Sequence, residues 1–109
     1  MKKILPFLFL GVAAAFNAVT DTTWTHYATS IFKGLDPNFW NAQVSWMHAY
    51  NFLGFVRFDA YHVSKLFTIG FIALAIVSYQ SFAKKWWLEC LAYCITWSIF
   101  FELFYSHIL

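Results

Sequence analysis

The chain has 109 residues, of which 61% are hydrophobic, 24% aromatic and only 11% charged. Soluble domains are about a quarter charged, so this composition excludes an ordinary soluble domain and indicates a small membrane protein. The net charge of +2 is slight and no long run of basic residues is present, which argues against nucleic-acid binding.

The first predicted element is a membrane helix over about residues 4–29. Lys2 and Lys3 precede an apolar run over 4–15, a pattern shared by signal peptides and by first membrane helices. Because the apolar residues continue beyond this run and helix-compatible polar residues follow, we expect a helix that is retained. Small residues lie on one side of it, where another helix can approach closely: Gly11, Ala14, Ala15 and Ala18.

Residues 30–57 connect the first helix to the second. Asp36 and Pro37 predict the N-cap and first position of a short helix after a turn. The segment over about 37–56 alternates aromatic and polar residues. It is too polar to cross hydrocarbon and too aromatic for water, so we expect it to lie at the membrane interface. Tryptophans at the predicted boundaries indicate aromatic belts: Trp24, Trp40, Trp46, Trp86 and Trp87. His48 is expected to be a wet interfacial residue.

Two further membrane helices are predicted over about 58–81 and 86–108, giving an all-α fold with three crossings in a single domain, residues 1–109. A helix of about 24 residues covers about 36 Å, against about 30 Å of hydrocarbon. Three crossings put the amino terminus and the Lys84–Lys85 turn on one side. The positive-inside rule makes this side cytoplasmic and places residues 30–57 and the carboxyl terminus outside, in a bacterial inner membrane.

This topology gathers acidic and histidine residues toward the outer leaflet. Asp59 and His62 are three apart and share a helix face, a spacing used by metal ligands in helix bundles. With Glu102 and His26 they form a candidate site for a divalent transition metal or haem, with Asp21 as the substitute for His26. On an ideal helix His107 points about 140° away from Glu102, so we do not expect both to face one point.

Other interpretations of these residues remain open. Asp59 or Glu102 can pair with Lys65 and tie the helices together, or the cluster can relay protons or a substrate. Cys90 and Cys94 have neither a zinc nor a redox spacing and are interpreted as small core-like thiols.

The middle of the chain resembles a group of small bacterial membrane proteins with three helices. The resemblance lies in Asn38-Phe-Trp-Asn41, Ser45-Trp46 and Asp59-Ala-Tyr-His-Val-Ser-Lys65, with a fainter match in Phe101-Glu-Leu-Phe-Tyr105. These proteins carry an Asp-x-aromatic-His pattern at the start of a spanning helix. The resemblance implies the architecture and nothing about chemistry.

The sequence contains no nucleophile motif, phosphate-binding loop or HExxH, so an enzyme is not the favoured class. The leading hypothesis is a non-catalytic accessory or assembly subunit of a larger membrane complex or homo-oligomer. The first alternative is a metal- or haem-binding membrane protein, and the second is an oligomeric channel or transporter.

Overall fold

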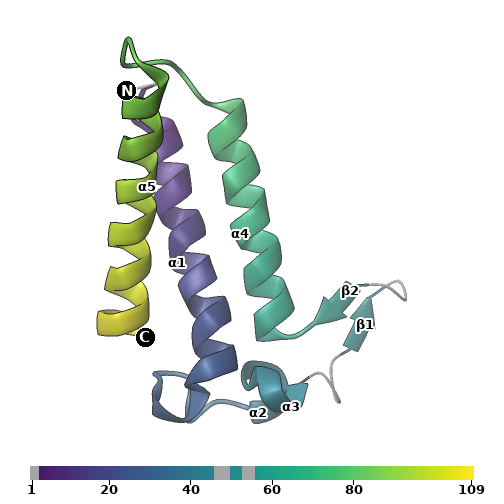
Figure 1. Cartoon of the computed structure of the whole chain (residues 1–109). Helices are drawn as coiled ribbons and strands as arrows, with labels where there is room; N and C mark the ends of the chain where they lie inside the picture. Colours follow the sequence, from purple (N-terminus) through teal and green to yellow (C-terminus); the bar gives the residue numbers. More distant parts are fainter. Residues whose placement is uncertain (1–2, 46–49, 53–55) are drawn as a thin grey trace.

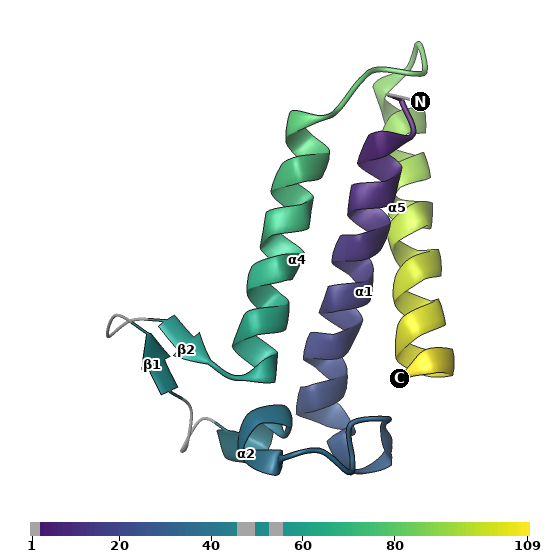
Figure 2. The same cartoon turned by 180° about the vertical axis from the view of Figure 1, so that it is seen from behind.

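The computed structural model describes residues 3–45, 50–52 and 56–109 and contains three long helices. These are α1 (Leu5–Thr25), α4 (Ala60–Val77) and α5 (Trp86–Glu102). A terminal π-helix, η2 (Leu103–Ile108), continues α5 without a break. Both views place α1 between α4 and α5 (Figures 1 and 2).

All three helical segments are long and apolar enough to cross a membrane: Leu5–Thr25, Ala60–Val77 and Trp86–Ile108. The prediction of three apolar helices is confirmed; the first two are shorter than expected, while the third apolar segment is Trp86–Ile108. The first ends at Thr25 because His26 leaves the helical conformation. The second begins at Ala60 because Asp59 caps it, and it ends at Val77 instead of residue 81.

The core includes three members of the predicted small-residue face of α1, Gly11, Ala14 and Ala18, whereas Ala15 of that face is only half-buried. Ala13, Ala14 and Ala18 have no exposed surface. A Cβ atom at Gly11 would lie 3.1 Å from ring carbons of Phe100, so glycine allows α5 to approach closely here. On the other side of α1, the ring of Phe16 stacks on two rings of α4, and these contacts complete the packing of the two helices.

Short elements connect α1 to α4: the 3-10 turn η1 (Tyr27–Thr29), the helices α2 (Pro37–Trp40) and α3 (Ala42–Ser45), and the strands β1 (Tyr50–Phe52) and β2 (Val56–Phe58). The strands pair antiparallel, with Tyr50 opposite Phe58. The Asp36 carboxylate accepts a hydrogen bond from the amide of Asn38 at 3.0 Å, which confirms the predicted cap. The all-α prediction holds for the long helices, while the hairpin was not predicted. The predictions for Trp46 and His48 lie outside the described residues.

The loop between α4 and α5 is organised by Glu89, in the first turn of α5. Its carboxylate, only 7% exposed, accepts hydrogen bonds from the Tyr79 and Ser81 hydroxyls and from the amides of Phe82 and Ala83. A buried carboxylate is stable where donors surround it, and here four groups of the loop provide them. Glu89 thus ties the first turn of α5 to the loop that follows α4.

The ends of the helices are arranged as the three-crossing topology requires. The carboxyl end of α1, the start of α4 and the end of α5 lie at the same end of the bundle, opposite the α4–α5 loop (Figure 1). Asp59 directly precedes α4 and Glu102 ends α5. The two acidic residues therefore lie toward the same end, as predicted.

Candidate functional site

Among the side chains whose burial the structure describes, Asp59 is the most buried ionisable one at this end, with 1% of its surface exposed. Its Oδ1 accepts a hydrogen bond from the amide of His62 at 2.8 Å, which caps α4. Its Oδ2 accepts a hydrogen bond from the hydroxyl of Ser45 at 2.6 Å. Burial alone would raise the pKa of the Asp59 carboxyl, but the hydrogen bonds from Ser45 and His62 outweigh it and lower the pKa below its ordinary value.

The ring of His62 forms a dyad with this carboxylate. Its Nδ1 lies 2.7 Å from Oδ1 of Asp59, so the predicted pairing of these residues on one face is correct. A carboxylate only accepts hydrogen bonds, so Nδ1 carries the hydrogen and the neutral ring keeps its lone pair on Nε2. The side chain of His62 is 43% exposed. The dyad therefore presents an oriented imidazole that can accept a proton or bind a metal through Nε2.

Lys65 pairs with neither Asp59 nor Glu102 within the part of the chain that the structure describes. Its Nζ lies 5.5 Å from the centre of the Tyr61 ring, a cation–π contact, and Tyr61 in turn packs against Trp24 of α1. Lys65 also attracts the carboxylate of Asp21 on α1 electrostatically. The expected interhelical attraction thus joins α1 to α4 and does not involve the dyad.

His26 lies at the end of α1, against η2. Its Nδ1 is 3.1 Å from the hydroxyl of Thr25, which is 2.8 Å from the hydroxyl of Tyr105. The His26 and Tyr105 rings meet edge to face at 4.6 Å. These contacts join the carboxyl ends of α1 and the third helical segment.

Glu102 and His107 share one groove, which corrects the expectation that they diverge. The groove has a volume of about 550 Å³ and is lined by Ser98, Ile99, Glu102, Leu103 and His107. The expectation assumed an α-helix to the end of the chain. From Leu103 the segment winds as a π-helix, with more residues per turn, so His107 comes round to the side of Glu102. The carboxylate of Glu102 accepts a hydrogen bond from the hydroxyl of Ser106 at 2.7 Å.

The predicted metal ligands are thus found in different local arrangements. The structure brings together Asp59 and His62, while Glu102 lies in the α5 groove and His26 beside Tyr105. No group of three or more His, Cys, Asp or Glu side chains that could hold a metal occurs among residues 3–45, 50–52 and 56–109. The site of four ligands remains a prediction.

Both cysteines are exposed on α5, so their interpretation as core-like thiols is wrong. The interpretation assumed that an apolar helix is surrounded by protein. In the structure α5 contacts the rest of the chain along one side only, because α4 diverges from it on the other side of α1 (Figure 2).

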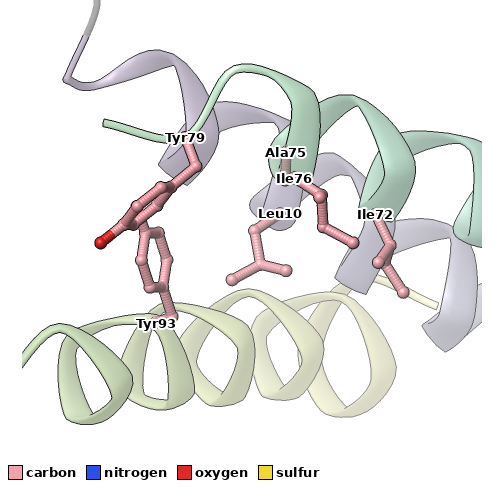
Figure 3. Close-up of a pocket in the computed structure, with 6 residues that line it drawn as sticks. All are labelled: Leu10, Ile72, Ala75, Ile76, Tyr79 and Tyr93. Carbon is pink, nitrogen blue, oxygen red and sulfur yellow. The ribbon is translucent and has the colours of Figure 1, made fainter. Parts of the chain in front are cut away.

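A separate apolar cleft opens between the three long helices near the α4–α5 loop. It has a volume of about 350 Å³ and is lined by Leu10, Ile72, Ala75, Ile76, Tyr79 and Tyr93 (Figure 3). Its polar groups are the two phenols, and the hydroxyl of Tyr93 is buried without a hydrogen-bond partner among the described residues. The cleft lies at the end of the bundle away from Asp59 and Glu102.

Two important residues were not predicted from the sequence. Ser45 looks like an ordinary polar residue of the connecting segment, and only the return of the chain brings it to Asp59. Glu89 belongs to no recognisable pattern in the sequence, although Tyr79 and Ser81, which precede the lysine turn, are potential donors to its carboxylate. Comparisons of this chain with protein families, with curated proteins and with solved structures found no match.

Proposed function

We propose that this protein is a non-catalytic subunit of a membrane assembly, either a larger complex or a homo-oligomer. The observation that carries the proposal is the unequal burial of the three apolar helices. In the most apolar stretch of each helix, 39% of the residues are buried in α1, 17% in α4 and 6% in the segment that contains α5. A bundle that leaves one helix so uncovered has a large surface for a protein partner.

The chemistry of the uncovered surface supports a protein neighbour over lipid alone. Glu102 lies inside the third apolar segment, six residues before its end. Its side chain is exposed, and no basic side chain pairs with it in the described ranges. An ionisable group at this depth is costly against hydrocarbon and is usually found facing protein or a wet cavity.

The proposal includes a membrane orientation. The lysine-bearing α4–α5 loop and the amino terminus would lie in the cytoplasm of a bacterial cell, with residues 30–57 and the carboxyl terminus outside and 37–56 at the interface. The charge distribution Lys2, Lys3, Lys84 and Lys85 supports this orientation. A reporter enzyme that is active only outside the cytoplasm, fused to the carboxyl terminus, tests this orientation. The proposed orientation predicts that the fused enzyme is active.

The decisive experiment is the mass of the purified protein in a mild detergent. Light scattering with subtraction of the detergent would give a defined multiple of the 12.8 kDa chain, or the chain in fixed ratio with another membrane protein. A single chain with no stoichiometric companion, in detergent and after reconstitution in nanodiscs, would contradict the proposal.

The second candidate function is metal or haem binding, favoured by the dyad of Asp59 and His62. A buried carboxylate that fixes the imidazole through Nδ1 is the usual support of a histidine ligand. Elemental analysis and haem absorbance would show a stoichiometric metal that is lost in His62→Gln. The metal would be kept in His107→Gln, because the His107 ring shares a groove with Glu102 but makes no hydrogen bond to a carboxylate among the described residues. Equal metal content in both variants would exclude the dyad as the ligand.

A further inference from the structure

We infer that a pocket at the end of the bundle that carries Asp59 binds the ring of a quinone, a flat and uncharged ring with carbonyl oxygens. The pocket has a volume of about 220 Å³ and lies between α1, α2 and α4. We call it the aromatic pocket, because five of the residues that line it are aromatic: Phe16, Phe32, Phe39, Trp40 and Phe67. This inference is independent of the proposed assembly.

The walls of the aromatic pocket come from segments that are far apart in the sequence. Phe16 of α1 stacks on Phe67 of α4, with ring centres 5.0 Å apart. Phe32, which follows η1, stacks on Trp40 of α2 at 4.6 Å. Because these rings pack against each other, the walls are formed before a ligand enters. An apolar cavity of about 150 Å³ accepts a benzene ring, so this pocket has room for one substituted ring.

Ser64 of α4 gives the aromatic pocket a hydrogen-bonding group. This residue is only 6% exposed, and its hydroxyl has no hydrogen-bond partner among the described residues. By contrast, the buried hydroxyl of Thr68, one turn further along α4, donates to the backbone carbonyl of Ser64 at 2.9 Å. A buried hydroxyl without a partner is costly and uncommon. A ligand that fits the pocket therefore carries an acceptor for the Ser64 hydroxyl.

The lining of the pocket favours a quinone over other flat rings. The face of an aromatic side chain is electron-rich, so an electron-poor ring stacks on it better than another electron-rich ring does. A quinone ring is electron-poor and its carbonyl oxygens accept hydrogen bonds, so it matches both the ring of Trp40 and the hydroxyl of Ser64. The residues that line the pocket include no charged side chain, which favours a ligand without charge.

Quenching of tryptophan fluorescence by duroquinone, which is tetramethyl-para-benzoquinone, provides the first test. This ring is fully substituted, so it does not add to the exposed thiols of Cys90 and Cys94. In nanodiscs, quenching by quinone bound in the pocket should saturate, whereas collisional quenching by quinone dissolved in lipid keeps rising with its concentration. Trp40→Phe, which keeps a ring in the wall, should remove most of the saturable quenching.

Ser64→Ala tests the hydrogen bond. Its loss should weaken the binding of duroquinone roughly 2- to 10-fold. The matched control Ser98→Ala removes a serine hydroxyl from α5, outside the aromatic pocket, and should bind duroquinone as the wild type does. Durene, the same tetramethyl ring without the two oxygens, should compete only weakly with duroquinone.

The outcomes decide between a quinone site and a pocket that any apolar group can fill. Saturable quenching that depends on Trp40 and on the hydroxyl of Ser64 supports the quinone site. Quenching without saturation overturns the inference, and so does saturable quenching that Trp40→Phe or Ser64→Ala leaves unchanged. Durene that competes as well as duroquinone also overturns it. The mass of the protein in detergent tests the proposed assembly separately from all of these results.

Discussion

Removal of the Asp59 carboxylate is the sharpest test of how the outer end of the bundle is built. Asp59→Ala deletes the N-cap of α4 and leaves the hydroxyl of Ser45 without its acceptor. Ser45 has no exposed surface, so water cannot replace the lost carboxylate without a rearrangement.

The magnitude follows from these two losses. An N-cap contributes about 0.5–2 kcal/mol, and an orphaned buried donor costs about 1–3 kcal/mol. We therefore expect Asp59→Ala to lower the free energy of unfolding by roughly 2–4 kcal/mol. Asp59→Asn keeps one acceptor oxygen for the cap, but its amide nitrogen replaces the oxygen that accepts from Ser45. It should lose less than Asp59→Ala, because the hydroxyl of Ser45 can rotate and accept from this nitrogen. Unfolding in mixed micelles, followed by tryptophan fluorescence, measures both values.

Asp36→Ala is the matched control. Asp36 is also an N-cap residue, but it is exposed and caps a helix of four residues, so its loss should be smaller. If Asp59→Ala lowers the free energy of unfolding by no more than Asp36→Ala does, the burial and bonding described for Asp59 are wrong.

The remaining predictions concern pH, helix packing and the loop. The folded state lowers the pKa of Asp59 from 3.8, so the stability that its carboxylate contributes is complete above pH 3.8 and is lost as pH falls through the folded pKa. The difference in free energy of unfolding between the wild type and Asp59→Asn should therefore shrink below pH 3.8. A difference that stays constant with pH would refute this prediction. Gly11→Leu should cost about 1–3 kcal/mol because the new side chain meets the ring of Phe100, while Gly70→Leu, with open space around it, should be nearly neutral in the same unfolding assay. Glu89→Gln should speed hydrogen exchange of the α4–α5 loop, since the carboxylate accepts four hydrogen bonds there; equal protection in both proteins would contradict it.

Local features of the site were predictable where they depend on neighbours in sequence. The pairing of Asp59 with His62 follows from a spacing of three residues on one helix, and the cap at Asp36 from the proline that follows it. The hydrogen bond from Ser45 to Oδ2 of Asp59 was not predictable. Ser45 belongs to the segment that connects α1 to α4, and the sequence does not show which path this segment takes.

The sequence by itself determined the three apolar helices, because hydropathy and length act within each segment. It also determined the small-residue face of α1, because the helical period decides which residues share a side. Only the three-dimensional structure decided the burial of Glu89, the exposure of both cysteines and the groove that Glu102 shares with His107. The first two depend on which segments become neighbours, and the third depends on a local change from α- to π-helical winding. Hydropathy and an assumed α-helical period give no information on either.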